Sequence, residues 1–334
     1  MSTRYFGPVP DPDGIHLLAG GWVRFTDVIC YSRGKSPERQ CATEIGHAAL
    51  DRLTAPRSPV AGLSLDQPRI MGILNATPDS FSDGGLFDDA EAGFAHARDM
   101  LEQGADILDI GGESTRPGAQ EVPPDQEVAR TVPLIARLRA EGFTTPLSID
   151  TRKAAVARAA LDAGADLIND VSAFSHDPEM SRLAVETGAP ACLMHAQGNP
   201  DTMQIAPKYQ NAVLDVYDYL ENKLSSMEAQ GMPRNRVLVD VGIGFGKTVS
   251  HNLELLRALG VFHGLGCGIL LGASRKSFIG ALTGAQVAAE RLPGSLAVAL
   301  HGVAQGVQVL RVHDVEETRQ ALTVWGHLTR REGP

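Results

Sequence analysis

The chain has 334 residues, of which 43% are hydrophobic and 21% charged, enough to bury the core of one large domain or two ordinary ones. The 30 Lys and Arg residues against 40 Asp and Glu give a net charge of -10, which argues against a general nucleic-acid or anionic-membrane surface but leaves room for a local basic pocket. Its four cysteines form no CxxC pair, no apolar run reaches about 18 residues, and prolines and acids interrupt the N-terminus, so a zinc ribbon, a membrane span and a signal peptide are not indicated and a cytoplasmic location is expected.

Residues 1–67 do not follow the pattern of the rest of the chain. The segment HLLAGGWVRFTDVICYSR predicts two short strands around an Ala-Gly-Gly turn, and ERQCATEIGHAALDRLT predicts a short helix. A link containing Pro and Gly follows it. We therefore expect a small N-terminal appendage and linker over residues 1–67, packed on a catalytic region that covers residues 68–334.

From about residue 68 the chain alternates short apolar runs with longer segments of helical apolar spacing, which predicts βαβ units and a parallel sheet. The eight apolar runs occupy residues 69–75, 106–112, 146–151, 166–170, 190–196, 236–242, 268–274 and 307–315. Eight units over roughly 260 residues match an α/β fold of the (β/α)8 TIM barrel type, which takes about 250 residues. A doubly wound open sheet is the alternative, but it would concentrate polar residues at one switch point.

Polar residues stand at the end of nearly every predicted strand. In chain order they are Asn75, Asp109, Asp150, Asn169 with Asp170, Met194 with His195, Asp240, Ser274 to Ser277, and Arg311 with His313. Any single one of these acids is more often a helix cap or turn former than a catalytic group, and Asp170 is an example. Together, on the C-terminal rim of one barrel, they indicate an active site.

The arrangement of these residues also suggests a ligand. Asp150, Asn169, Asp240 and Lys276 come from strands that face one another across a barrel mouth, so they can surround a flat heterocycle with an aminopyrimidinone edge. Asn75, Arg311 and His313 meet where the first and eighth strands are neighbours, and they form a cationic corner suited to a diphosphate with Mg²⁺.

The stretch DVGIGFGKT resembles a nucleotide-binding loop, but its spacing fails. A Walker A loop needs Gly five positions before its second Gly, and Val241 occupies that position relative to Gly246. The glycines therefore indicate a close approach of the backbone to a ring, or a mobile loop.

Seven motifs make the chain from about residue 68 to the end resemble the dihydropteroate synthases of the folate pathway. They are NATPDSFSDGG, DIGGESTRPGA, SIDTRK with LIND, LMHAQGNPDTMQ, DVGIGFGKT, LLGASRKSFIG and RVHDV. The resemblance implies a (β/α)8 transferase that joins 6-hydroxymethyl-7,8-dihydropterin diphosphate to p-aminobenzoate and releases diphosphate and 7,8-dihydropteroate, with Mg²⁺ as cofactor. It also implies a sulfonamide target and a homodimer formed through the later helices.

Residue roles are carried over motif by motif. The pterin pocket would consist of Asp109, Asp150, Asn169, Met194, Asp240 and Lys276, and the diphosphate and metal side of Asn75, Thr115, Arg116, Arg311 and His313, with Asn75 as the metal ligand. Phe81, Pro117 and Ser277 would form part of the p-aminobenzoate site. The residues expected to act in catalysis are Asp109, Asp150, Lys276, Arg311 and His313, with Asp150 stabilising a pterin cation as diphosphate departs.

Three positions depart from the pattern of the family. Val241 stands where the family usually has Pro, and Ala196 and Asp201 stand where Met and a basic residue are frequent. The segment TPDSFSDGG after Asn75 has the composition of a mobile lid that orders over the site with Phe81 near p-aminobenzoate.

Two alternatives stay open at this point. One is a methyltransferase on a related pterin-binding barrel that acts on methyltetrahydrofolate, which would not need Arg311, His313 or the GGESTRPG motif. The other is a catalytically silent paralogue that binds pterin or a partner protein and regulates folate supply. Such a protein would have lost loop or diphosphate-binding groups, and none is lost here.

Overall fold

The computed structural model describes residues 3–76, 86–114, 121–198 and 203–329. Eight parallel strands close into a barrel in the order β10-β11-β12-β5-β6-β7-β8-β9. The strands are β5 (Arg69–Asn75), β6 (Ile107–Gly111), β7 (Leu147–Asp150), β8 (Leu167–Asp170), β9 (Ala191–Met194), β10 (Val237–Asp240), β11 (Gly268–Leu271) and β12 (Val309–Val312). The (β/α)8 barrel predicted from the alternation is confirmed, and the open-sheet alternative is wrong because β12 pairs with β5 and closes the ring.

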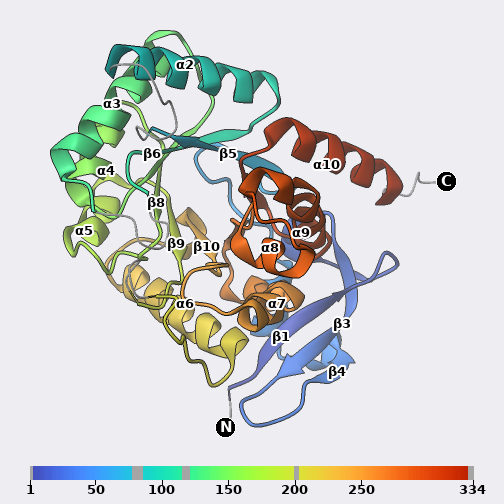
Figure 1. Ribbon diagram of the computed structural model, residues 1–334. Coiled ribbons are helices and arrows are strands. Elements are labelled where there is room, and N and C mark those ends of the chain that lie inside the picture. Colours follow the sequence, from blue (N-terminus) through green and yellow to red (C-terminus); the bar gives the residue numbers. More distant parts are fainter. Residues whose placement is uncertain (1–2, 77–85, 115–120, 199–202, 330–334) are drawn as a thin grey trace.

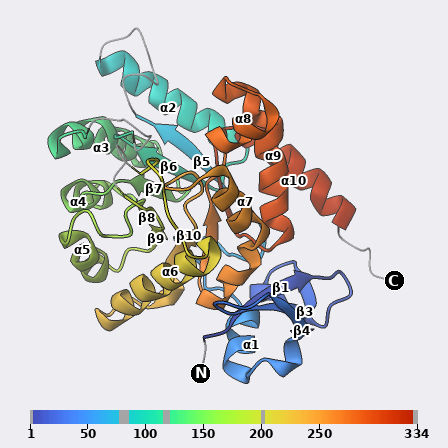
Figure 2. The ribbon, with the colours of Figure 1, turned by 60° about the horizontal axis from the view of Figure 1, so that its bottom comes forward.

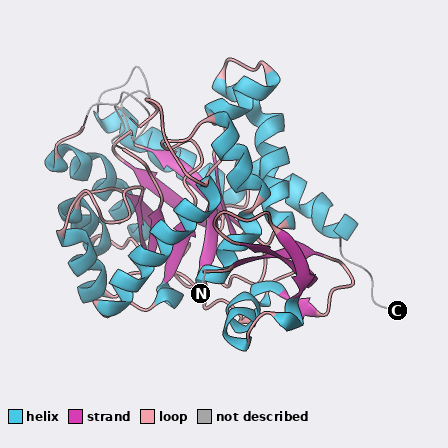
Figure 3. Ribbon diagram, turned by 90° about the horizontal axis from the view of Figure 1, so that it is seen from below, coloured by secondary structure: helices cyan, strands magenta, loops and turns pink. Residues whose placement is uncertain are grey.

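Helices surround the barrel, as Figures 1 and 3 show. They are α2 (Leu86–Glu102), α3 (Pro124–Ala140), α4 (Ala154–Asp162), α5 (Glu179–Thr187), α6 (Ala212–Ala229), α7 (Val249–Arg257), α8 (Ser277–Thr283), α9 (Leu292–Ala304) and α10 (Val315–Thr329). Short 3-10 turns accompany them at η4 (Arg234–Arg236), η5 (Leu259–Leu265) and η6 (Ala288–Arg291). Strands covered on both faces have no solvated side, which is why they read as continuous apolar runs.

The lower part of the barrel interior is an apolar floor. It consists of Met71, Ile107, Leu167, Cys192, Leu238, Leu270 and Val309, one from each of seven strands, with Val60 and Leu65 from the preceding link. Side chains two positions apart on a strand share a face. The residues two positions after the floor therefore also point inward, one layer nearer the C-terminal rim, and they include Asp109, Asn169, Met194, Asp240 and Arg311.

The N-terminal appendage is a four-stranded antiparallel sheet with one helix, and it lies against one side of the barrel (Figures 1 and 2). Its elements are β1 (Tyr5–Pro10), β2 (His16–Leu17), η1 (Leu18–Gly20), β3 (Arg24–Tyr31), β4 (Glu38–Cys41), η2 (Ala42–Glu44) and α1 (His47–Thr54). The two expected strands correspond to β2 and β3. The expected helix begins only at His47, because Glu38–Cys41 pairs with β3 as a strand.

Side chains of the appendage bond to the barrel at several points. The Tyr5 hydroxyl donates to Asp218 Oδ1 at 2.8 Å, the Trp22 indole donates to the Val303 carbonyl at 2.9 Å, and Arg33 Nη1 pairs with Asp215 at 2.7 Å. Arg57 Nε donates to the Cys267 carbonyl at 3.0 Å. The proposed boundary between residues 67 and 68 stays a prediction.

No helix within the described ranges is both long enough and apolar enough to cross a membrane.

Candidate active site

The centre of the site is an arginine held between two carboxylates. Arg311 Nε donates to Asp109 Oδ2 at 2.5 Å and Arg311 Nη2 donates to Asp150 Oδ2 at 2.7 Å. Asn169 Nδ2 also donates to Asp109 Oδ2, at 3.0 Å. Each of these side chains points into the barrel from a different strand, so the closed sheet itself brings them together. The sequence analysis placed Arg311 with the diphosphate group, and in the structure its guanidinium contacts Asp109 and Asp150, two of the residues predicted to form the pterin pocket.

Each of the two carboxylates keeps one oxygen without a partner. Asp109 Oδ1 and Asp150 Oδ1 are buried and accept no hydrogen bond from any residue that the structure describes. A buried acceptor without a donor is costly. The two oxygens are therefore matched to a ligand that brings N–H donors into the barrel mouth.

Burial dominates the electrostatics of Asp150. It raises the pKa of this carboxyl from its ordinary value of 3.8 to about 7, against the opposing charge of Arg311 and with the help of the neighbouring Asp109. Burial also raises the pKa of Asp240, where Lys276 is the main opposing charge. A carboxyl that titrates near neutrality inside a cleft is a common feature of catalytic sites.

Asp240, at the end of β10, and Lys276, after β11, are predicted to form the opposite wall of the ligand site. The Asp240 Oδ1 oxygen accepts from the Gly242 N–H at 2.7 Å, and Lys276 Nζ donates to the Ile243 carbonyl and lies 4.7 Å from the centre of the Phe245 ring. Burial lowers the pKa of Lys276 to about 8, although Asp240 opposes this change. Both residues are therefore held by the turn that follows β10.

The segment before Lys276 has a constrained backbone. Arg275 adopts a φ of 57°, which non-glycine residues rarely do. Its N–H donates to Ser295 Oγ at 2.8 Å, its carbonyl accepts from Arg291 Nη1 at 3.0 Å, and its guanidinium pairs with Asp314. These bonds fix the backbone at Arg275 and thereby the orientation of the next residue, Lys276. Ser277 follows as the exposed first residue of α8.

The predicted diphosphate corner lies where β12 pairs with β5. Asn75 is the half-buried last residue of β5, and His313 directly follows β12. His313 Nδ1 lies 3.0 Å from Ser274 Oγ, which also accepts the His313 N–H at 3.3 Å. Met194 is buried at the end of β9, beside Asp240 in the sheet register. Phe81, Thr115, Arg116 and Pro117 and the whole predicted lid lie outside the described residues.

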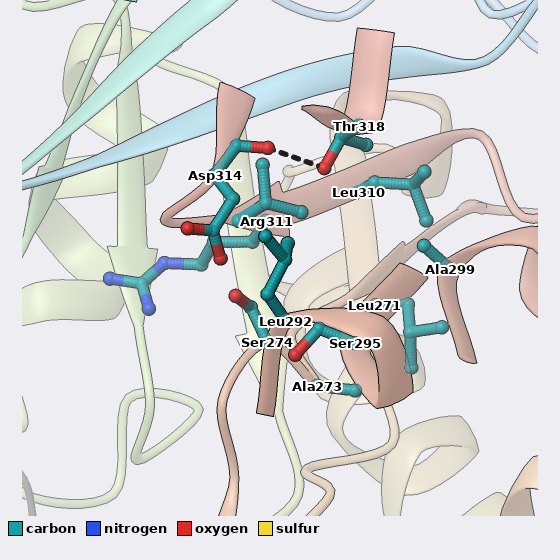
Figure 4. A pocket seen from close by; sticks show the side chains of 11 residues that line it. Leu271, Ala273, Ser274, Leu292, Ser295, Ala299, Leu310, Arg311, Asp314 and Thr318 are labelled. Carbon is teal, nitrogen blue, oxygen red and sulfur yellow. Dashed lines mark hydrogen bonds between the residues drawn. The ribbon is translucent and has the colours of Figure 1, made fainter. Parts of the chain in front are cut away.

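A small cavity lies on the other side of β11 and β12, between these strands and helices α9 and α10. Apolar side chains, including Leu271, Ala299 and Leu310, line this cavity, and Figure 4 shows the Arg311 guanidinium extending away from them. The cavity has a volume of about 10 Å³, so it can hold one water molecule at most. It is a packing gap behind the site.

One group of buried charges was missed by the sequence reasoning. Lys153 Nζ lies 3.2 Å from Glu113 Oε1 and donates to Glu127 Oε2 at 2.7 Å, while Arg152 Nη2 donates to Glu113 Oε2 at 3.0 Å. Glu113 Oε1 also accepts the Val122 N–H at 2.9 Å. Glu113, Arg152 and Lys153 stand inside quoted motifs, but their partner Glu127 lies in helix α3, where a charged residue looks like ordinary helix surface.

The structural interpretation of Asp170 is consistent with its contacts. Asp170 Oδ1 accepts the Ser172 N–H at 2.7 Å, and its Oδ2 accepts the Phe174 N–H at 2.9 Å. Both carboxylate oxygens therefore accept backbone N–H groups of the turn after β8, and Asp170 stabilises that turn.

A closed (β/α)8 barrel with buried carboxylates at its C-terminal end is typical of an enzyme that binds a polar ligand there. Comparison with known proteins agrees with this class. The family model for pterin binding enzymes matches residues 71–313. The dihydropteroate synthase of Neisseria meningitidis serogroup B is 48% identical over 268 residues, which are 79% of this chain and 93% of the relative.

Two solved structures from Xanthomonas albilineans are similar as well. Its dihydropteroate synthase with 4-aminobenzoic acid has a TM-score of 0.77 and 45% identity, covering 84% of this chain and 99% of that one. The same enzyme in complex with 7,8-dihydropteroate has a TM-score of 0.75 and 42% identity, covering 84% and 100%. The chain therefore belongs to the pterin binding enzyme family, and within it to the dihydropteroate synthases. The whole appendage, residues 1–67, precedes the region matched by the family model.

Proposed function

We propose that this protein catalyses the condensation of 6-hydroxymethyl-7,8-dihydropterin diphosphate with p-aminobenzoate, forming 7,8-dihydropteroate and diphosphate. The proposal rests on two buried oxygens, one on Asp109 and one on Asp150 on either side of Arg311, that accept no hydrogen bond from the described residues. They are acceptors for the donor edge of a pterin. Membership of the dihydropteroate synthases supports the same reaction.

The pterin ring would lie in the barrel mouth between the two walls. Asp109, Asn169 and Asp240 would bond its polar edge, and the buried Met194 would pack against a face of the ring. Lys276 would donate to a ring acceptor. A ring without these donors and acceptors would leave buried polar groups unpaired and would be rejected.

The reaction exchanges a C–O bond for a C–N bond. The bond between the pterin methylene carbon and the diphosphate oxygen breaks, and its electron pair leaves with diphosphate. The resulting carbon cation is conjugated with the electron-rich pterin, and ionised Asp150 would stabilise it. The p-aminobenzoate nitrogen then forms the new bond and releases one proton, which makes dihydropteroate neutral at that nitrogen.

Arg311 and His313 would neutralise the charge that develops on diphosphate, together with Thr115 and Arg116. Ser277, with Phe81 and Pro117, would bind p-aminobenzoate. Because its aromatic amine is a weak nucleophile, position and exclusion of water should matter more than a general base.

Mg²⁺ would be held by Asn75 and by the diphosphate itself. In the described part of the chain no cluster of three or more His, Cys, Asp or Glu side chains is arranged to hold a metal. One amide oxygen from Asn75 together with diphosphate oxygens suits an ion that keeps several waters and binds chiefly to substrate phosphates, as Mg²⁺ does. When bound, the ion would supply positive charge next to the leaving group.

A homodimer and a cytoplasmic location are further parts of the proposal. Four apolar side chains in or next to the later helices are exposed: Leu282 in α8 (55%), Val287 just before η6 (58%), and Val324 (60%) and Leu328 (80%) in α10. Such residues suit a subunit interface. The four cysteines are all free, which suits a reducing compartment. Light scattering of the purified protein tests the dimer.

The decisive experiment is a two-substrate assay with the full-length protein and Mg²⁺. Diphosphate should be released together with dihydropteroate only when both substrates are present, and a sulfonamide should compete with p-aminobenzoate. An Asp150→Asn variant serves as the inactive control. No dihydropteroate from the wild type would refute the synthase. Methyl transfer from methyltetrahydrofolate would favour the related methyltransferase, and pterin binding without turnover would favour a regulatory paralogue.

A further inference from the structure

Two loops beside the predicted pterin pocket contact each other closely. One follows β9 and includes residues 195–198 and 203–211, and the other is the turn over residues 241–248 after β10. The His195 N–H donates to the Asp240 carbonyl at 3.0 Å, and the Tyr209 hydroxyl donates to the Gly246 carbonyl at 2.8 Å. A Cβ at Gly242 would lie 1.9 Å from the His195 carbonyl oxygen. Only glycine allows this contact.

Lys247 links the two loops from the inside. Its side chain is almost fully buried, and its Nζ lies 2.9 Å from His195 Nδ1, 3.2 Å from the His195 carbonyl oxygen and 3.0 Å from the Phe245 carbonyl oxygen. These contacts suit both protonation states. The ammonium donates to all three atoms, and the neutral amine donates to the two carbonyls and accepts from Nδ1–H.

All three hydrogen bonds that the Lys247 ammonium can donate are therefore used within the protein, and none is left for a phosphate. This agrees with the sequence, whose glycine spacing does not match a Walker A loop. The position of Lys247 also explains what the turn does with its three glycines. Gly242, Gly244 and Gly246 have φ values of 68°, 83° and 62°, and a turn of this composition has high conformational entropy when nothing holds it. Lys247 supplies three contacts that hold it.

The other side of the same turn contacts the pterin-pocket lysine. The Ile243 carbonyl accepts from Lys276 Nζ, and the Phe245 ring lies 4.7 Å from that nitrogen. Phe245 thus offers its carbonyl to Lys247 and its ring to Lys276. Because one residue makes both contacts, a displacement of Phe245 on the Lys247 side also changes its contact with Lys276.

We propose that Lys247 is a positioning residue, which fixes the β10–α7 turn against His195 and thereby sets the position of Lys276 for the pterin diphosphate. The inference deepens the proposed function and rests on it. Lys247 does not touch the substrate, since its Nζ is occupied by protein acceptors. Its effect reaches the substrate through Ile243 and Phe245.

A double-mutant cycle between Lys247→Met and Lys276→Met tests the proposal. Lys247→Met alone should lower kcat/KM for the pterin diphosphate at least tenfold. In the Lys276→Met background the same change should lower it less than twofold, because the side chain that the turn positions is already absent. The exposed Lys208 in the neighbouring loop provides the control, and Lys208→Met should leave both kinetic constants unchanged.

Equal losses from Lys247→Met in both backgrounds, or no loss in either, would overturn the positioning role. If Lys247→Met does not fold, His195 supplies the second pair of variants. His195→Asn keeps an acceptor near the position of Nδ1 and should retain at least half of the wild-type kcat/KM. His195→Leu removes the side-chain contact with Lys247 Nζ and should lower kcat/KM at least threefold. Equal activities of the two variants would refute the link.

The wild-type assay separates this inference from the proposed function. An active wild type with an additive cycle refutes only the positioning role. A wild type that makes no dihydropteroate refutes the synthase itself and the inference with it.

Discussion

Replacing Asp150 by Asn removes a buried negative charge that lowers the stability of the folded barrel. Burial raises the pKa of Asp150 from 3.8 to about 7, so between these values the folded chain binds a proton that the unfolded chain has released. At about 1.4 kcal/mol per pH unit, this difference in pKa lowers the free energy of unfolding, relative to acid pH, by roughly 4 kcal/mol at pH 8, where Asp150 is ionised in both states, and by roughly 2 kcal/mol at pH 5, where only the unfolded chain has lost the proton. The cost develops as pH rises from about 4 to about 7 and is constant above that.

The expected result is a variant that is more stable and less active. Asp150→Asn should unfold at higher urea concentration than the wild type, with a gain of several kcal/mol at pH 8 that shrinks towards pH 5. Its kcat should fall about 10²- to 10³-fold, the usual loss when one charge-stabilising group is removed. Its affinity for the pterin diphosphate should fall much less than kcat, because an asparagine amide oxygen can still accept a hydrogen bond from the pterin but carries no charge to stabilise the cation.

Urea unfolding at the two pH values, together with steady-state kinetics and calorimetric binding, measures all three quantities. Asp162→Asn, in the last turn of α4, is a control that replaces a surface carboxylate. A variant less stable than the wild type at pH 8 would refute the claim that burial dominates at this residue. Equal losses in kcat and in affinity would argue against stabilisation of a cation.

Other predictions follow from the same site. The kcat/KM of the wild type should rise with pH through about 7 as Asp150 ionises and fall above about 8 as Lys276 loses its proton; a Lys276→Met variant that keeps the alkaline limb would contradict this assignment. Arg311→Met leaves two buried carboxylates without their counter-ion and should lower stability by about 3–5 kcal/mol. Arg311→Lys should not restore it, because one ammonium cannot replace a two-armed guanidinium; recovery in urea unfolding would count against the bridge. A chain starting at residue 56 should retain activity, whereas one starting at residue 68 loses Val60 and Leu65 from the barrel floor and should be less stable by a further 1.5–3 kcal/mol per side chain, roughly. Calorimetry of both truncations tests this, and equal Tm values would contradict it.

Local patterns in the sequence were sufficient to predict the barrel and the rim. Each strand is a short apolar run that ends in a polar residue, and a period of two along a strand decides which residues face inward. The pattern therefore predicted Asp109, Asn169, Asp240 and Arg311 as members of one site before their contacts were known. The appendage was harder to predict, because Glu38–Cys41 becomes a strand only by pairing with β3.

The tertiary structure decided which of these groups touch. Arg311 pairs with Asp109 and Asp150, which precede it by 202 and 161 residues, so their contact exists only after the last strand has closed the ring. The link between Lys247 and His195 has the same origin, since two loops from adjacent strands must approach before one amine can reach both backbones. The sequence by itself determined the elements and the chemical character of the rim, because these depend on short-range periodicity. Which carboxylate shares which cation, and how far burial raises its pKa, depends on distances that only the closed barrel defines.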